Sequence, residues 1–210
     1  MTLERRAAMA ALVKDRDDDL LVVPGLGSTT WDLAAAGDDP RNFYLWGAMG
    51  GAAMIGLGLA LAQPDRRVAV ITGDGEMLMG LGALATIGSK RPPNLAVIVF
   101  DNGVYGETGM QPSHTQNGVD LIRIAGACGI ATCLDVRDDH VLADLAARLK
   151  NLRGTLFARV LISADERPAY YLCATAPRSR AGSARPLALK PEFGAFWTVR
   201  IWAFITPAPC

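Results

Sequence analysis

Two short polar turns follow apolar, β-branched runs in the middle of the chain. The tripeptide GDG at 73–75 comes directly after the run RVAVIT, and DNG at 101–103 comes directly after the run LAVIVF. In an open parallel sheet, ligands bind outside the carboxyl ends of the strands. If both runs are neighbouring strands of such a sheet, Asp74 and Asn102 lie close together. A carboxylate and an amide oxygen beside phosphate oxygens suit octahedral Mg²⁺, so we expect a metal and phosphate site at this edge.

The glycines of the first turn support the same interpretation. Gly73 and Gly75 would allow the backbone to come close to a phosphate, and a helix that opens near Glu76 would point free N–H groups at it. An isolated GDG is more often an ordinary turn with a capping aspartate. The functional interpretation therefore depends on the second turn, in which Asn102 is followed by glycine and then by Tyr105.

The rest of the chain supplies the elements that position these turns. Near-continuous apolar runs alternate with helical patterns, which is typical of strands buried on both faces of a parallel sheet. We therefore expect an α/β fold with a doubly wound, mainly parallel sheet and helices on both faces. The predicted strands are Leu20–Val23, Phe43–Leu45, Arg67–Thr72, Leu95–Phe100, Ala131–Val136 and Thr155–Ile162. The predicted helices are Trp31–Ala36 capped by Ser28-Thr29-Thr30, Met49–Ala62, Met77–Ile87, Val119–Cys128, and Asp139–Leu152 capped by Asp138 or Asp139.

The stretch GDGEMLMGLGALATIGSKRPPNLAVIVFDNGVYG, from 73 to 106, resembles the cofactor-binding motif of thiamine diphosphate (ThDP) enzymes. The resemblance extends from about Leu20 to about Ile162 and covers the diphosphate-binding domain of that family. It implies that Mg²⁺ is bound by Asp74, Asn102 and the backbone carbonyl of Val104. The residues that it implies for cofactor binding are Gly47, Ala48, Met49, Gly73, Asp74, Gly75, Glu76, Asn102, Val104, Tyr105 and Gly106.

The segment WGAMG at 46–50 looks like the part of the family that surrounds the bend of the cofactor. By that likeness Met49 would be the bulky side chain under the folded cofactor, and the carbonyl of Gly47 would accept a hydrogen bond from its aminopyrimidine. The alternative is that Met49 is an ordinary core residue. Asp101 stands where many members have an asparagine. Because that position is not a metal ligand in the family, the difference does not argue against the site.

A narrower likeness comes from DNGVYGETGMQPSHT at 101–115 and PGLGSTTWDLAAAGDDPRNFYLWGAMG at 24–50. Together they resemble the β-subunit type of sulfopyruvate and phosphonopyruvate decarboxylases. This implies a carboxy-lyase acting on a 2-oxoacid with a second anionic group. It also implies a hetero-oligomer in which a separate pyrimidine-binding α subunit supplies the activating glutamate. About 20 residues precede the first predicted strand, too few for a second α/β domain.

Two alternatives remain open. The chain could belong to a carboligase of the acetolactate synthase type, or it could be a non-catalytic subunit that binds ThDP for assembly.

His114 lies on the loop after the metal ligands, where it could transfer a proton, hold an anionic substrate group or simply face solvent. Glu76 and Glu107 are expected at the diphosphate end, too far from the aminopyrimidine to activate it. His140 is expected at the surface.

Composition excludes several classes of partner. Lys and Arg together number 21, as do Asp and Glu, and without a basic patch we expect no nucleic-acid partner. Four cysteines without a CxxC pair predict a reducing, cytoplasmic setting. The N-terminus predicts an amphipathic surface helix rather than a signal peptide. Phe43–Ala62 carries no charge over 20 residues, but its glycines favour a turn and a buried helix over a membrane span.

The regular pattern ends near Asp165. We expect the ThDP diphosphate- and Mg-binding domain at 1–167 and an atypical C-terminal tail at 168–210. The tail contains Trp197, Trp202 and three phenylalanines, which would form an apolar patch unless they are covered. A partner chain could cover them, or the tail could be read in a shifted frame.

Overall fold

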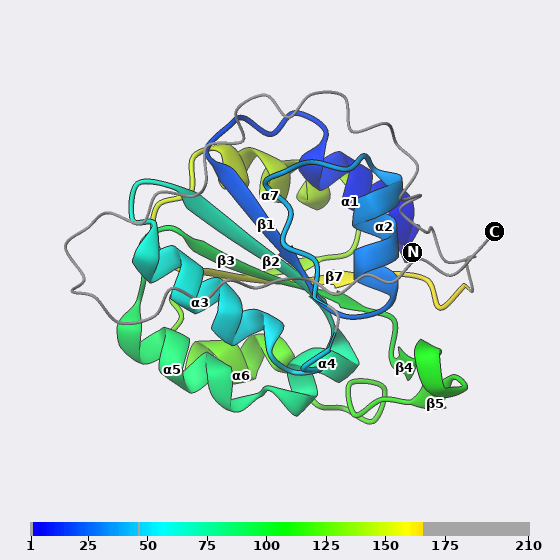
Figure 1. Cartoon of the computed structure of the whole chain (residues 1–210). Coiled ribbons are helices and arrows are strands. Elements are labelled where there is room, and N and C mark those ends of the chain that lie inside the picture. Colours follow the sequence, from blue (N-terminus) through cyan, green and yellow to red (C-terminus); the bar gives the residue numbers. More distant parts are fainter. Residues whose placement is uncertain (1, 46, 166–210) are drawn as a thin grey trace. The chain divides into compact units, whose positions relative to one another are not determined.

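The computed structural model describes residues 2–45 and 47–165. Five strands form a parallel sheet in the order β1-β2-β3-β7-β6. Their bounds are β1 Leu20–Pro24, β2 Arg67–Gly73, β3 Leu95–Asp101, β6 Thr132–Val136 and β7 Leu156–Leu161. A separate antiparallel pair, β4 Val104–Tyr105 and β5 Gln111–Pro112, lies beyond the carboxyl end of β3, next to the short 3-10 helix η1 Gly106–Thr108 (Figure 1).

Helices cover both faces of the sheet, as the sequence predicted (Figure 1). One face packs against α3 Ala52–Ala62, α4 Asp74–Met79, α5 Gly82–Lys90 and α6 Leu121–Ala127, and the other against α1 Arg5–Val13, α2 Ser28–Ala35 and α7 Asp139–Lys150. Successive strand residues point to opposite faces. Val70 therefore packs in the core with α3, while the next residue, Ile71, packs in the core with α1 and α7.

The predicted strand Phe43–Leu45 is not a strand. This segment meets the edge strand β1 through one bridge between Asn42 and Val22, with the N–H of Phe43 donating to the carbonyl of Val22 at 2.8 Å. Beyond that bond Leu45 turns into the core, whereas Phe43 stays 42% exposed. A strand needs repeated pairing along its edge, and here the pairing ends after one residue.

The predicted helix Met77–Ile87 is divided into α4 and α5. The break falls at Gly80, where an added Cβ would lie 2.1 Å from the carbonyl oxygen of Gly50. The turn that precedes α3 therefore approaches the backbone of Gly80 too closely for any side chain. The same turn explains why α3 begins at Ala52 rather than at Met49.

The predicted cap of α2 is also wrong. The helix begins at Ser28, and its N-cap is Gly27, at a φ of 71° and without a side-chain cap. The hydroxyls of Thr29 and Thr30 donate back to the carbonyl of Gly25 instead, at 3.1 and 2.7 Å. By contrast, Asp138 caps α7 as predicted and accepts from the N–H of Val141 at 2.9 Å.

Across residues 2–45 and 47–165, no helix is both long enough and apolar enough to cross a bilayer. The uncharged segment that resembles a span contributes α3, which has 11 residues and packs under the sheet. The predicted tail at 168–210, with its tryptophans, lies outside the described residues.

Candidate active site

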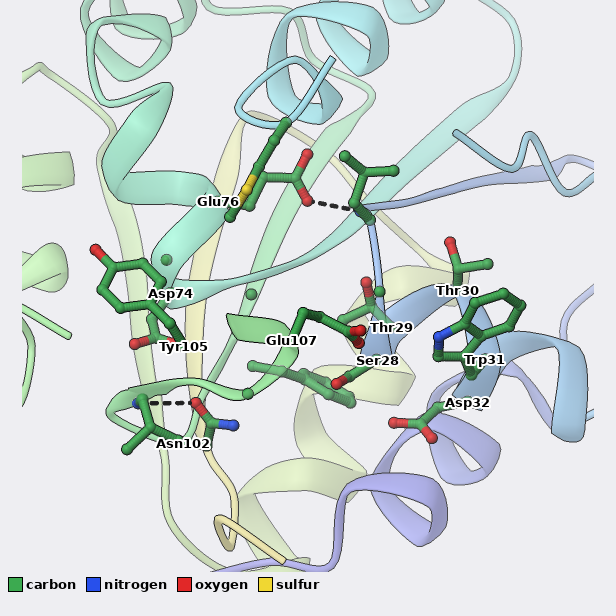
Figure 2. Close-up of a pocket in the computed structure, with 18 of the residues that line it drawn as sticks. Ser28, Thr29, Thr30, Trp31, Asp32, Asp74, Glu76, Asn102, Tyr105 and Glu107 are labelled. Atoms are coloured by element: carbon green, nitrogen blue, oxygen red, sulfur yellow. Dashed lines mark hydrogen bonds between the residues drawn. The ribbon is translucent and has the colours of Figure 1, made fainter. Parts of the chain in front are cut away.

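The two polar turns lie at neighbouring strand ends. Strands β2 and β3 pair in parallel up to Gly73 opposite Phe100, so Asp74 and Asn102 both follow closely on the last paired positions. Figure 2 shows Asp74, Tyr105 and Asn102 on one side of a pocket and residues of α2 on the other, with Glu107 extending between them. The parallel register alone therefore brings the two turns together.

The pocket has a volume of about 370 Å³. It collects most residues that the sequence analysis singled out: Met49, Gly73, Asp74, Gly75, Glu76, Asn102, Val104, Tyr105, Gly106 and Glu107. Gly47, Ala48 and His114 are not among its lining residues. The His114 side chain is exposed on the loop that follows β5. His140 lies in the first turn of α7, on the other face of the sheet from α4.

Asp74 is buried, at 2% exposure. Its Oδ2 atom accepts a hydrogen bond from the hydroxyl of Ser113. Thr115 Oγ1 lies 3.2 Å from the same oxygen, but its one proton is shared with the closer Asp101. Burial raises the pKa of the Asp74 carboxyl above its usual value, and the Ser113 hydroxyl opposes that rise. A buried carboxylate of this kind gains most from a cation. Both hydroxyls lie on the side of Oδ2, so neither of them occupies Oδ1.

Asp101 and Asn102 are adjacent but serve different surroundings. Asp101 is buried, and its Oδ1 accepts from the N–H of Gly103 at 3.1 Å and from Thr115 Oγ1 at 2.8 Å. Asn102 lines the pocket, and its Oδ1 accepts from the N–H of Val104 at 3.1 Å. An amide oxygen has two lone pairs, so Asn102 retains one for a ligand.

Glu76 ties the floor of the pocket together. Its Oε2 accepts from the N–H of Leu26 at 2.9 Å, the bond drawn at Glu76 in Figure 2. The same oxygen accepts from Thr72 Oγ1 at 2.8 Å. Its other oxygen, Oε1, is buried and has no hydrogen-bond partner among the described residues. The carboxylate also fills the space beside Gly25, where an added Cβ would lie 1.9 Å from Oε2.

The N-terminus of α2 opens onto the same pocket, a feature that the sequence analysis missed. Helix N-termini present N–H groups without intrahelical partners and favour anions. Here Gly27 leaves them without a side-chain cap, and Glu107 lies close by: a Cβ added at Gly27 would be 2.7 Å from Glu107 Oε1. The available signal was Gly25-Leu26-Gly27 directly after an apolar strand, which permits a close approach.

These features fit a diphosphate and its metal. In the described part of the chain, no three or more His, Cys, Asp or Glu side chains gather as a metal site. The expected metal ligands are instead one carboxylate, one side-chain amide and one backbone carbonyl. A Cβ added at Gly73 would meet nothing within 4 Å, so its backbone is open to a ligand. Together with the buried Asp74 and the uncapped α2, this makes a cradle for an anion and a cation.

Comparisons with known proteins agree with this geometry. Residues 25–160 match the family described as "Thiamine pyrophosphate enzyme, C-terminal TPP binding domain" (thiamine pyrophosphate, TPP, is ThDP). The "Sulfopyruvate decarboxylase subunit beta" of Methanocaldococcus jannaschii is 43% identical over 72% of this chain and 78% of that protein. The "Phosphonopyruvate decarboxylase" of Streptomyces viridochromogenes is 42% identical over 68% of this chain but 36% of that protein.

A solved structure shares the fold. The benzoylformate decarboxylase of Polynucleobacter necessarius superposes with a TM-score of 0.67 at 20% identity, over 80% of this chain and 34% of that one. The family match covers more than half of the chain, and it includes both polar turns and the N-terminus of α2. The chain therefore belongs to the thiamine pyrophosphate enzymes, as their C-terminal TPP-binding domain.

Proposed function

We propose that this chain is the diphosphate- and Mg²⁺-binding subunit of a ThDP-dependent 2-oxoacid decarboxylase. The observation that carries the proposal is the position of the buried Asp74 beside Asn102, at the ends of two adjacent parallel strands and inside one pocket. The 43% identity with a sulfopyruvate decarboxylase β subunit supports the decarboxylase assignment.

In this proposal, Asp74, Asn102 and the carbonyl of Val104 hold the metal. The open backbone at Gly73 and the N-terminus of α2 hold the diphosphate, for which Glu107 must move away from Gly27. Met49, which lines the pocket and is 44% exposed, supports the folded cofactor. When bound, ThDP supplies the electron sink that decarboxylation of a 2-oxoacid requires; the chain's own residues bind and orient it.

A second chain, the pyrimidine-binding α subunit, supplies the activating glutamate. Two acids of the pocket are engaged elsewhere: Glu76 accepts from Leu26 and Thr72, and Asp32 pairs with two arginines. The match to about a third of the phosphonopyruvate decarboxylase, and the subunit name of the 43% relative, support a divided enzyme. We place this hetero-oligomer in the cytoplasm, consistent with the free Cys128 and Cys133.

The proposed substrate is a 2-oxoacid with a sulfonate or phosphonate group. The test is CO₂ release by the chain reconstituted with its candidate α subunit, ThDP and Mg²⁺, from sulfopyruvate, phosphonopyruvate, pyruvate and benzoylformate. We expect one of the first two to be preferred. A preference for pyruvate or benzoylformate would overturn the substrate assignment. Acetolactate formation from pyruvate would favour the carboligase, and no turnover with any partner would favour the non-catalytic subunit.

A further inference from the structure

The loop after β3 folds back onto the turn that carries Asp74. Strands β4 and β5 pair, and the N–H of Ser113 then donates to the carbonyl of Gly103 at 2.7 Å. This closure places Ser113 and Thr115 next to Asp74, which directly follows β2, although both are far from Asp74 in the sequence. Ser113 has no exposed surface.

The two hydroxyls form a compact network with two buried carboxylates. Ser113 Oγ donates to Asp74 Oδ2 and lies 2.8 Å from Thr115 Oγ1. Thr115 Oγ1 in turn lies 3.2 Å from the same Asp74 oxygen and 2.8 Å from Asp101 Oδ1. Both hydroxyls contact the same carboxylate oxygen of Asp74, Oδ2.

We propose that Ser113 and Thr115 are positioning residues that fix the orientation of the Asp74 carboxylate, with Oδ1 directed to the metal. The inference rests on the proposed function, because it requires a metal at Asp74. Rotation of the carboxylate about its last side-chain bond would break the Ser113 bond and move Oδ2 away from the Thr115 hydroxyl, which Asp101 holds in place. The ligand is therefore oriented before the metal arrives, which lowers the entropy that binding must overcome.

The choice of metal gives this role a distinct signature. Mg²⁺ demands near-ideal octahedral geometry, whereas Ca²⁺ accepts six to eight ligands in flexible arrangements. A loosened Asp74 should therefore weaken Mg²⁺ binding much more than Ca²⁺ binding. Loss of a group that orients a ligand typically costs about 10- to 100-fold in metal affinity. Simple damage to the fold would weaken both ions alike.

The same network gives the Ser113-His114-Thr115 segment a second explanation. The sequence analysis considered a role for His114, yet it is the side chains of Ser113 and Thr115 that contact the turn carrying Asp74. His114 contributes its carbonyl, which accepts from the N–H groups of Asn117 and Val119 at 3.1 and 3.0 Å. The two hydroxyls, rather than the imidazole, connect this loop to Asp74.

The test is calorimetric titration of Mg²⁺ and of Ca²⁺ into the full chain, with its partner, at saturating ThDP. We expect Ser113→Ala and Thr115→Val to lose about 10- to 100-fold in Mg²⁺ affinity and several-fold less in Ca²⁺ affinity. Thr115→Ser, which keeps the hydroxyl, should restore Mg²⁺ binding. Thr155→Val is the matched control, because Thr155 donates to Pro92 at 2.7 Å and does not contact Asp74.

Wild-type Mg²⁺ affinity in both Ser113→Ala and Thr115→Val would overturn the inference, as would equal losses for Mg²⁺ and Ca²⁺. If Ser113→Ala fails to fold, the Thr115 pair decides alone. Asp74→Ala, titrated in parallel, separates the two proposals. If it keeps Mg²⁺-dependent ThDP binding, the metal site itself is wrong; if it loses binding while the hydroxyl variants do not, only the positioning role fails.

Discussion

Gly25→Ala should damage the floor of the pocket through a steric conflict that a second substitution can relieve. The φ of Gly25 is not positive, so alanine meets no backbone strain there. The new methyl would instead lie 1.9 Å from Glu76 Oε2 and 2.7 Å from Thr72 Oγ1. Glu76 must then move and give up its bonds to Leu26 and Thr72.

The size of the effect follows from those contacts. Overpacking typically costs about 1–3 kcal/mol, and hydrogen bonds to a charged group contribute about 1.5–3 kcal/mol each. Because Glu76 relieves the overpacking by giving up both bonds, we expect Gly25→Ala to lower the free energy of unfolding by about 3–6 kcal/mol. Glu76→Ala removes the obstructing carboxylate but leaves the Leu26 N–H and the Thr72 hydroxyl without their partner.

The double variant Gly25→Ala/Glu76→Ala isolates the conflict. Without the carboxylate the new methyl keeps only its lesser conflict, with Thr72 Oγ1 at 2.7 Å. The double variant should therefore be more stable than the sum of the two single effects by at least about 1 kcal/mol. Urea unfolding measures the free energy of unfolding of all three variants, and unchanged m-values show that the shifts reflect stability alone. Strict additivity would refute the argument, because it would mean that the methyl of residue 25 and the carboxylate of Glu76 do not meet.

Three further predictions concern the charged groups around the pocket. Asp74→Ala should abolish Mg²⁺-dependent ThDP binding and Asn102→Ala should weaken it, measured by calorimetry; unchanged binding in Asp74→Ala would contradict the site. Because burial raises the pKa of Asp74 and a metal binds its ionised form, Mg²⁺ affinity should fall as the pH is lowered toward that pKa. Mg²⁺ binding should also release protons, detectable as a buffer-dependent calorimetric enthalpy; an enthalpy that does not depend on the buffer would count against this. Asp32→Asn should destabilise the chain by about 3 kcal/mol, because the buried Arg5, whose Nε lies 3.2 Å from Asp32 Oδ2 outside hydrogen-bond geometry, would lose its counter-charge. Arg6→Gln, which alters the more exposed partner, is the control and should cost less, and equal losses in thermal unfolding would contradict the assignment.

The sheet and the meeting of the two polar turns could be predicted because both depend on local patterns. Apolar β-branched runs indicate strands, and parallel pairing then places Asp74 beside Asn102 wherever the strands are neighbours. The break at Gly80 could not be predicted, since it depends on the backbone of Gly50. The short segment at Phe43 could not be distinguished from a strand, because its apolar sequence is typical of one. Only the folded chain shows that its pairing with β1 ends after a single bridge.

Contacts across long stretches of chain account for the rest of the site. The bond from Leu26 to Glu76 and the bonds from Ser113 and Thr115 to Asp74 join residues that are 50, 39 and 41 positions apart. Serine and threonine in a polar loop carry no sequence signal for such a role. Only the folded loop shows that these hydroxyls, and not His114, meet the buried carboxylate.

Decarboxylation by the isolated chain and by the chain reconstituted with its candidate α subunit, each at saturating ThDP and Mg²⁺, tests whether this chain is one half of a divided decarboxylase. Sulfopyruvate and phosphonopyruvate are the substrates, and CO₂ release is the readout. We expect no turnover from the isolated chain, turnover on reconstitution, and loss of that turnover with Asp74→Ala. Full activity from the isolated chain would contradict it.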